Sequence, residues 1–510
     1  MNLFKSTTTF SFFTIISRIL GYIRDIFIAM FLGSGPLADA FFVAFRIPNT
    51  FRRLFSEGTF NAAFVPSYAS ELANGKDQSE KFATKVFSLL FISLLFIVLI
   101  IEIFMPVFIF LIAPGFSGNE TKMDIAITLS RITFPFLLFV SLSSFFSAIL
   151  NSHNRFAVAA AAPVILNILL IIVLIYGNIL GDELVYYLSY AITLAGILQF
   201  IYLYIYVKKF YLPKFSFKNL IDNKVKTFFS KLLPSIFSSG VTQINILVGT
   251  IIASFQAGAV SYLYYADRIY QINLAIAGIA IGTVILPQLS NLIEKENKSQ
   301  IILIQNKALE LSLFLSIPAT VALFIGSSAI MSALFGYGSF SESSVEKSAL
   351  ALFFFAFGLP AFSLIKVFSS FFFSRHDTKT PFYISLISVF LNVLISIIFF
   401  KKIGFIIIPI ATSISSWFNA IILYIYSKRK NFFEFNNVFI FRFPRILLSS
   451  FIMGLFFYFI LNLMSDKLIY EENFKLIYLI LCIIATLACY LTISVFTKAF
   501  KFSDINLKYK

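Results

Sequence analysis

Charged residues are scarce in this sequence, and their scarcity excludes an ordinary soluble protein. Only 13% of the 510 residues are charged, whereas 59% are hydrophobic. A soluble globular domain has about 25% charged residues. With a mean hydropathy of +0.91, the chain is expected to lie in a lipid bilayer.

Cysteine and histidine are also rare, and they offer neither a disulfide framework nor a metal site. Cys482 and Cys489 lie seven positions apart in one apolar run, which is about 10 Å along a helix and too far for a disulfide. His153 and His376 lie in separate polar hairpins, so they do not form the clustered ligands that a metal such as zinc needs. We therefore expect no metal and no bound cofactor.

Long apolar runs fill most of the chain. They are about 20 residues long, the length at which a helix crosses a bilayer, and they lack the strict alternation of barrel strands. Lys5 precedes a run that reaches Arg18 without a small-residue cleavage site, so we expect a retained first helix and no signal peptide. We predict an all-α integral membrane protein with about 14 transmembrane helices, near 10–33, 38–60, 84–112, 125–150, 158–180, 184–207, 231–256, 262–288, 304–329, 346–373, 381–400, 404–427, 444–464 and 475–497.

The basic residues are distributed unequally between alternate loops. If the N-terminus is cytoplasmic, 26 lysines and arginines fall in cytoplasmic segments and 6 in external ones. The positive-inside rule then predicts that both termini are cytoplasmic. The net charge of +16 is thus mostly a signature of topology and of anionic inner-leaflet lipids. No nucleic-acid binding is expected, because the basic residues are scattered over many short loops.

An internal repeat divides the chain. The segments "FPFLLFVSLSSFFSAIL" (134–150) and "LPAFSLIKVFSSFFFSR" (359–375) align at an offset of 225, and the same offset pairs Asn167 with Asn392. This offset covers six helices, so the two copies point the same way, as in transporters whose repeats are related by an axis along the membrane normal. We predict two six-helix lobes related by a pseudo-two-fold axis and followed by two extra helices, with bounds of 1–220, 221–435 and 436–510.

Several basic residues fall within or beside the predicted spans, where a charge costs roughly 2.5 to 3.5 kcal/mol even on a lenient insertion scale. On a helix, Arg18, Gly21 and Asp25 share one face, and Arg24 lies beside it. Basic residues outnumber acids in these spans, so pairing cannot neutralise them all. An excess of guanidinium groups in a wet cavity favours a polyanion with phosphate oxygens. The eight residues are Arg18, Arg24, Arg46, Arg52, Arg53, Arg131, Arg268 and Lys366.

Pro48 lies in the most charged of these segments, "DAFFVAFRIPNTFRRLFSEGTF" (39–60). A proline removes an amide donor and clashes with the preceding turn. The second helix is therefore predicted to kink or break there, which would expose backbone groups to a water-filled cavity or to neighbouring protein.

A structural explanation of the same charges stays open. Arg53 and Arg131 could extend their charged ends to the membrane surface, and Lys366 could either do the same or line a cavity. Three further arginines have an acidic residue in reach and could form structural ion pairs: Arg24 with Asp25, Arg46 with Asp39, and Arg268 with Asp267.

Four segments carry a resemblance to a known family: "SRILGYIRDIFIAMFLGSGPLADAFFVAFRIPNTFRRLFSEGTFNAAFVP" (17–66), "YYADRIYQ" (264–271), "GTVILPQLS" (282–290) and "FFSRHDTKTP" (372–381). They resemble the MurJ (MviN) family of bacterial lipid II flippases, in the MOP superfamily of multidrug and oligosaccharidyl-lipid transporters. The resemblance runs through essentially the whole chain and is most specific in its first 66 residues.

The resemblance implies a transporter rather than an enzyme. It would flip lipid II, the undecaprenyl-pyrophosphoryl disaccharide-pentapeptide used in cell-wall synthesis, from the inner to the outer leaflet of the bacterial cytoplasmic membrane by alternating access. Membrane lipids and the cell-wall synthesis machinery are the other partners that it implies. The residues implied to bind the substrate, four of which are cavity arginines of the family, are Arg18, Arg24, Arg52, Arg268, Asp39, Ser17, Gly21, Asp25, Asn49 and Glu57.

The family also suggests an energy source and a place for the lipid tail. Some members bind sodium through acidic residues of the second lobe, whereas the corresponding region here offers Gln243, Asn245 and Asn392 but no clear acid. Sodium and the membrane potential thus both stay open as the energy source. In the family, the last two helices form a hydrophobic groove for the polyprenyl tail.

Two other functions fit parts of the sequence. An exporter of another lipid-linked oligosaccharide, or of an amphipathic drug, would share the two lobes but would not need so cationic a first lobe. An enzyme acting on polyprenyl phosphates would need acids for a metal or a base at the membrane surface. The longest polar loop, about 208–230, is instead rich in lysine.

Overall fold

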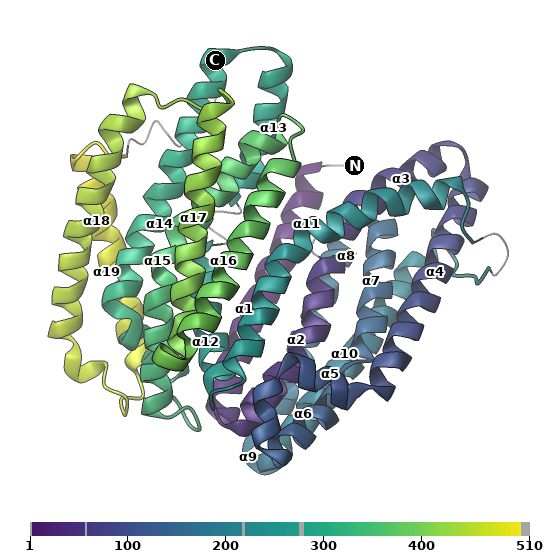
Figure 1. Ribbon diagram of the computed structural model, residues 1–510, viewed down its shortest axis with the longest axis horizontal. Coiled ribbons are helices and arrows are strands. Elements are labelled where there is room, and N and C mark those ends of the chain that lie inside the picture. Colours follow the sequence, from purple (N-terminus) through teal and green to yellow (C-terminus); the bar gives the residue numbers. More distant parts are fainter. Residues whose placement is uncertain (1–2, 57–58, 217–219, 275–279, 501–510) are drawn as a thin grey trace. The chain divides into compact units, whose positions relative to one another are not determined.

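The structure is a computed structural model, and it describes residues 3–56, 59–216, 220–274 and 280–500. All regular elements in those ranges are helices (Figure 1), so the predicted all-α class is confirmed. The chain divides into two compact units, Met1–Ser261 and Tyr262–Lys510.

Eleven α-helices and two short 3-10 helices form the first unit in the described ranges. Their bounds are α1 (Leu3–Leu32), α2 (Pro36–Ser56), α3 (Thr59–Ala73), α4 (Lys76–Ile103), α5 (Met105–Ile112), η1 (Pro114–Gly118), α6 (Glu120–Thr133), α7 (Phe136–Ser152), α8 (Phe156–Ile175), α9 (Gly177–Leu180), η2 (Gly181–Glu183), α10 (Leu184–Val207) and α11 (Asn223–Ala253).

The remaining helices belong to the second unit, apart from the first turn of α12. Their bounds are α12 (Ala259–Leu274), α13 (Ala280–Glu294), α14 (Lys298–Phe335), α15 (Glu342–Phe373), α16 (Lys379–Ile403), η4 (Gly404–Ile406), α17 (Ile407–Arg429), α18 (Asn437–Leu463), η5 (Ser465–Lys467) and α19 (Lys475–Phe496).

Nine helical stretches of the described chain are long and apolar enough to cross a membrane. One of them, Lys379–Arg429, contains the two helices α16 and α17 joined by η4. Each predicted span falls on a helix or on two consecutive helices, wherever the structure describes it. The chain is therefore a multi-pass membrane protein, and the number of 14 spans stays a prediction.

An aromatic cluster joins α11 to the first unit. The ring of Phe64 in α3 lies 5.1 Å from that of Phe145 in α7 and 5.9 Å from that of Phe228 in α11, measured between centroids. The first unit thus extends to Ser261, whereas the first predicted lobe ends at residue 220. The division of the sequence into 1–220, 221–435 and 436–510 stays a prediction.

Two ion pairs hold the start of α11 in the first unit. Lys224 pairs with Glu71 of α3, and Lys85 Nζ of α4 lies 2.7 Å from Asp222 Oδ2. Partial burial pushes the pKa of Asp222 upward, but the Lys85 ammonium and the Val225 amide outweigh it and hold this pKa below its usual value. The carboxylate is therefore ionised at neutral pH and caps α11, because Asp222 Oδ1 accepts the amide hydrogen of Val225 at 2.9 Å.

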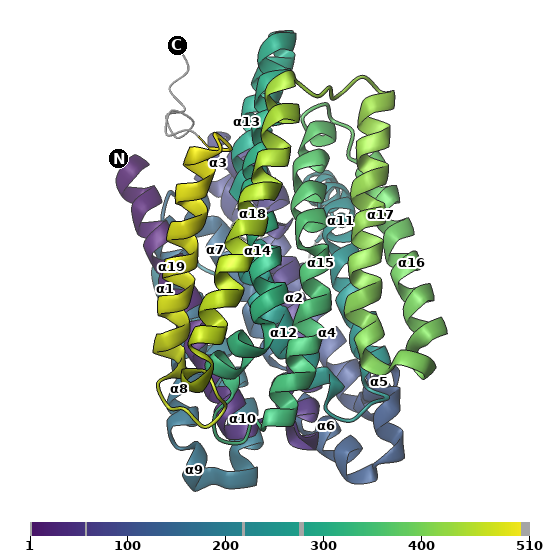
Figure 2. The same cartoon turned by 90° about the vertical axis from the view of Figure 1, so that its left-hand side faces the viewer.

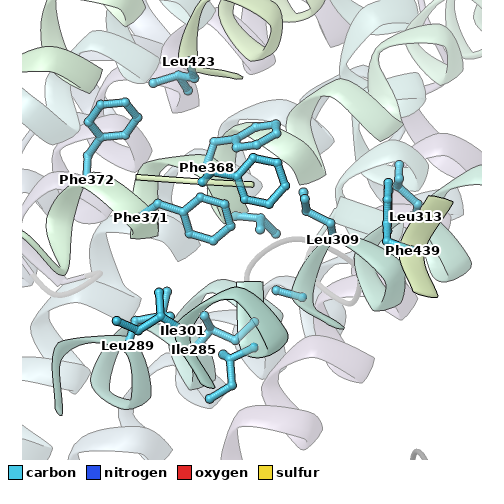
Figure 3. Packing of buried hydrophobic residues seen from close by; sticks show 14 of the residues in the cluster. Ile285, Leu289, Ile301, Leu309, Leu313, Phe368, Phe371, Phe372, Leu423 and Phe439 are labelled. Carbon is cyan, nitrogen blue, oxygen red and sulfur yellow. The ribbon is translucent and has the colours of Figure 1, made fainter. Parts of the chain in front are cut away.

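Aromatic rings of α15 are the centre of the core of the second unit. Phe368, Phe371 and Phe372 are buried among side chains of α13, α14, α17 and α18 (Figure 3). Leu289 of α13 and Leu423 of α17 belong to the same cluster and have no exposed surface. Lipid cannot drive apolar helices together as water does, so close packing of this kind supplies much of the attraction between membrane helices.

The last two helices, α18 and α19, lie side by side and next to α14 (Figures 1 and 2). Arg442 of α18 pairs with Glu310 of α14. Lys475, at the start of α19, donates to the carbonyl oxygen of Gly336 at 2.7 Å, where a cation also complements the negative end of the α14 dipole. These polar contacts fix both ends of the helix pair to the second unit.

Similar cross-helix contacts occur in both units, at positions 222 and 220 residues apart, close to the repeat offset of 225. In the first unit, the hydroxyl of Thr193 donates to the carbonyl oxygen of Ile132. In the second, the hydroxyl of Ser413 donates to the carbonyl oxygen of Phe354 at 2.6 Å. The first contact joins α10 to the end of α6, just before the repeated motif, and the second joins α17 to α15 before that motif. The similarity agrees with a structural origin of the repeat.

The turns that follow α7 and α15 also make similar contacts, at positions 222 residues apart. His153 stacks on the ring of Phe210 with centroids 4.3 Å apart, and the guanidinium of Arg375 lies 4.5 Å from the ring centre of Phe432. Burial lowers the pKa of His153, so it is neutral at physiological pH and stacks as an aromatic ring. The first unit therefore stacks an imidazole on a phenylalanine ring, and the second unit stacks a guanidinium on one.

Gly115 lies where two loops of the first unit touch. Its amide donates to Ser254 Oγ at 3.0 Å, and a Cβ added there would lie 2.4 Å from backbone atoms of Phe255. We expect Gly115→Ala to lower the free energy of unfolding by about 1 to 3 kcal/mol, because the clash is with backbone and forces both loops apart. Melting of the purified protein in detergent measures this. Gly118→Ala is the matched control, since its Cβ meets nothing within 4 Å, and equal melting temperatures for the two variants would contradict the prediction.

Candidate functional site

Arg24 is buried and hydrogen-bonded to two side chains. Its Nε and Nη2 donate to Asp25 Oδ1 at 3.0 and 2.7 Å, and its Nη1 donates to Asn167 Oδ1 of α8 at 2.9 Å. Arg24 is 7% exposed and Asp25 is 2% exposed. The predicted pair of Arg24 with Asp25 is confirmed, and the guanidinium is hydrogen-bonded to both an acid and an amide.

Asn167 connects the predicted face of α1 to α8. Its amide nitrogen donates to the carbonyl oxygen of Ser17 at 2.9 Å, and a Cβ at Gly21 would lie 3.8 Å from the same amide group. Ser17, Gly21 and Arg24 therefore meet this side chain, and Asp25 joins them through Arg24. Of the face that spacing predicted, Gly21 lies here, and Ser17 was implied by the resemblance. Asn167 was not predicted as a site residue, although its repetition at Asn392 was a signal for it.

Arg18 differs from Arg24 in its surroundings. It lies six residues earlier on α1 and its side chain is exposed. A guanidinium that is exposed on a predicted membrane span can reach a ligand without first breaking a structural contact. Arg18 and Arg24 thus offer one accessible and one pre-oriented positive charge on neighbouring faces of α1.

The middle of α2 carries the next predicted residues. Arg52 Nε donates to Asn49 Oδ1 at 3.0 Å, so these two predicted residues are brought together within one turn. The predicted break at Pro48 is not seen, because α2 is helical from Pro36 to Ser56. The carbonyl oxygen of Ala44, which Pro48 leaves without its usual amide partner, instead accepts the hydroxyl of Thr133 in α6 at 3.1 Å.

Asp39 is fully buried at the beginning of α2. Its Oδ2 lies 2.6 Å from Lys122 Nζ of α6 and accepts the amide of Gly258 at 2.8 Å. Its Oδ1 accepts the amide and the hydroxyl of Ser261 at 3.0 and 2.7 Å. Asp39 thus pairs with Lys122 rather than with Arg46, the partner that the sequence suggested. Its carboxylate caps the first turn of α12.

Arg268 is the one predicted binding residue that belongs to the second unit. Its Nη2 donates to the Tyr264 hydroxyl at 2.7 Å, and its guanidinium lies 4.5 Å from the centre of that ring. Asp267, the predicted partner of Arg268, accepts a hydrogen bond from Gln271. Lys366 has an exposed side chain on α15, and Glu57 lies outside the described residues.

Asn392, the repeat counterpart of Asn167, makes polar contacts between α16 and α17. Asn392 Nδ2 donates to Thr412 Oγ1 at 3.2 Å, and the hydroxyl of Ser396 lies 3.2 Å from Asn392 Oδ1.

In the described ranges, no group of three or more histidine, cysteine or acidic side chains is arranged to hold a metal ion.

Comparison with known proteins places the chain in a family. A family model described as "Lipid II flippase MurJ" matches residues 28–500. The probable lipid II flippase MurJ of Rhizobium tropici is 38% identical over 460 residues, which cover 89% of this chain and 86% of that protein. The one of Rickettsia prowazekii (strain Madrid E) is 38% identical over 434 residues, which cover 84% and 85%.

Solved structures agree with this placement. A lipid II flippase MurJ in an inward closed conformation is 27% identical and has a TM-score of 0.81, with 96% of this chain and 98% of that chain covered. A multidrug resistance MATE family transporter of the MOP superfamily, in an inward-facing conformation, is 16% identical with a TM-score of 0.66 and covers 81% and 94%. The second likeness shows the fold alone, whereas the matches in sequence reach across nearly the whole chain. The chain therefore belongs to the family of lipid II flippases described as MurJ.

Proposed function

We propose that this chain flips lipid II from the inner to the outer leaflet of the bacterial cytoplasmic membrane. The observation that carries the proposal is the match of the lipid II flippase family over residues 28–500. The arginines placed within the membrane-spanning part of the chain agree with a substrate that has a pyrophosphate group. Fork-shaped guanidinium groups bind phosphate oxygens through paired, charge-assisted hydrogen bonds.

The arginines take different parts in this proposal. Arg18, which is exposed, makes the first contact with the pyrophosphate. Arg24 and Arg52 are oriented in advance by Asn167 and Asn49, so they lose little side-chain entropy when they bind. Arg268, held by the Tyr264 hydroxyl, is the fourth arginine that we assign to the pyrophosphate, and transport proceeds by alternating access.

The proposed function also implies how the chain is oriented in the membrane and which partners it meets. Both termini lie in the cytoplasm, so that the excess of basic loops faces the inner leaflet where lipid II is made. Released lipid II is the substrate of cell-wall synthesis, whose enzymes are then the partners at the outer surface. The groove of the last two helices, α18 and α19, takes the polyprenyl tail.

Arg52→Ala tests the function and the role of α2 together. In cells depleted of their own lipid II flippase, we expect the wild type to restore the amount of lipid II accessible at the outer leaflet. Arg52→Ala at matched abundance should restore at most about a tenth, because a hydrogen bond to a charged group contributes roughly 1.5 to 3 kcal/mol.

Lys226→Ala is the control, because it removes an exposed positive charge near the start of α11 and should export lipid II like the wild type. Failure of the wild type to restore export, together with no lipid II binding by the purified protein, would contradict the proposed substrate. Equal export by the wild type and Arg52→Ala would make Arg52 a structural residue.

A further inference from the structure

Three prolines inside membrane helices share one arrangement. A proline at position i has no amide hydrogen, so the carbonyl oxygen at i−4 loses its partner within the helix. At each of these three sites, a hydroxyl from another helix donates to that oxygen. The contacts are Thr133 to Ala44 at 3.1 Å for Pro48, Tyr490 to Phe314 at 2.7 Å for Pro318, and Thr320 to Ala356 at 3.2 Å for Pro360.

These contacts matter because hydrocarbon offers a carbonyl oxygen no other donor. A buried polar group without a hydrogen bond is costly, and membrane helices tolerate proline where a neighbouring side chain supplies the missing donor. The hydroxyl must stay within bonding distance of the carbonyl oxygen. The contact therefore holds the proline-containing helix close to the helix that carries the hydroxyl and limits how it bends at the proline. Proline and hydroxyl together therefore set the direction of the helix beyond the proline.

The contact at Pro48 lies next to the proposed binding residues. Ala44 is 2% exposed and Thr133 has no exposed surface, so no solvent competes for this contact. Asn49 follows Pro48 directly, and Arg52 lies one turn beyond it. The Thr133 hydroxyl is also 3.2 Å from the Ser130 oxygen of its own helix, but the oxygen of Ala44 is the nearer acceptor and the one in another helix.

We propose that Thr133 is a positioning residue that orients the half of α2 carrying Asn49 and Arg52, through its hydrogen bond to the carbonyl oxygen freed by Pro48. Thr133 itself contacts no substrate. Without its hydroxyl, the segment after Pro48 tilts to bring the Ala44 oxygen to another donor, and the guanidinium of Arg52 leaves its binding position. The inference rests on the proposed function for its transport readout only.

Thr133→Val tests the proposal, because valine keeps the volume of the side chain and removes only the hydroxyl donor. In proteoliposomes, we expect this variant to raise the half-saturating lipid II concentration about tenfold, equivalent to about 1.4 kcal/mol. Its maximal rate and melting temperature should change much less. Thr133→Ser, which keeps the hydroxyl, should restore the wild-type value.

Pro48→Ala tests whether Thr133 acts on lipid II binding through the carbonyl oxygen of Ala44. Alanine returns an amide donor to the Ala44 oxygen, so adding Thr133→Val to Pro48→Ala should change the half-saturating concentration less than twofold. A full tenfold effect in both backgrounds would overturn the proposal, because Thr133 would then act by another route. Wild-type behaviour of Thr133→Val, or equal impairment of the valine and serine variants, would overturn it as well.

A second readout does not depend on transport. With Cys482 and Cys489 replaced by serine, Phe51→Cys reports the orientation of the turn after Pro48 through its rate of alkylation by a water-soluble maleimide. Thr133→Val should change this rate at least threefold, and Thr133→Ser should not. An unchanged rate would overturn the inference even if lipid II is flipped, whereas a changed rate without flipping by the wild type would contradict the proposed substrate alone.

Discussion

Asp39→Ala is expected to cause one of the largest losses of stability in the protein, about 3 to 5 kcal/mol in the free energy of unfolding. Its carboxylate is fully buried and neutralises Lys122, which is 7% exposed. Removal of one partner of a buried ion pair leaves the other charge without compensation. It also leaves the amides of Gly258 and Ser261 without their acceptor at the start of α12. Melting of the purified protein in detergent would show the loss.

The two partners of this pair are not equivalent, which gives a sharper form of the prediction. Lys122→Met should cost less than Asp39→Ala, because Asp39 would still accept three hydrogen bonds at the positive end of a helix dipole. Asp124→Ala removes an exposed acid of the same helix as Lys122 and should leave the melting temperature nearly unchanged. A larger loss for Lys122→Met than for Asp39→Ala would contradict this account of the site.

Local sequence predicted the pair of Arg24 with Asp25 within one helix, but not the partners of Asp39 and Asp267. Arg24 and Asp25 are adjacent, and the spacing of Ser17 and Gly21 places both on the side of α1 that meets Asn167. The 3.6-residue period is fixed by backbone geometry, so such relations follow from the sequence once the helix is known. The membrane helices could be predicted for the same reason, because the bilayer sets their length and polarity.

Ion pairs between helices that are distant in sequence could not be predicted from local spacing. Asp39 and Lys122 lie 83 positions apart, and six lysines fall in the predicted external segments, so sequence alone gave no reason to choose Lys122. The contact depends on how α2 and α6 pack against each other. Arg46, the residue that helical spacing suggested, shares a face with Asp39 but lies two turns along the same helix.

The fate of Pro48 shows the same limit. Sequence predicted a kink or a break at Pro48, with the freed backbone groups facing a water-filled cavity or neighbouring protein. The structure shows no break in α2, and neighbouring protein satisfies the Ala44 oxygen through the Thr133 hydroxyl. A hydroxyl 89 positions away can do this only because α6 packs on α2, and that packing is a tertiary property.

Arg24→Ala should abolish transport more completely than any other single change in α1. The variant removes three hydrogen bonds, two to Asp25 and one to Asn167, and it leaves a buried carboxylate without its guanidinium. Up to about 3 to 5 kcal/mol of stability would be lost for that reason alone. Loss of a charge-assisted bond to the pyrophosphate would lower the flipping rate by a further factor of about 10 to 100. Flipping by protein of matched abundance in proteoliposomes, together with melting curves, measures both effects.

A double variant separates the two causes. In Arg24→Ala with Asp25→Ala, the buried carboxylate that loses the Arg24 guanidinium is gone as well, so the melting temperature should recover part of its loss. Flipping should stay as low as in Arg24→Ala if the guanidinium contacts the pyrophosphate, because no other group on that face of α1 replaces its fork of donors. Recovery of flipping together with stability would instead make Arg24 a structural counterion of Asp25. Arg155→Ala, which removes an exposed arginine from the hairpin after α7, should change neither quantity, since it lies away from the membrane-spanning part of the chain.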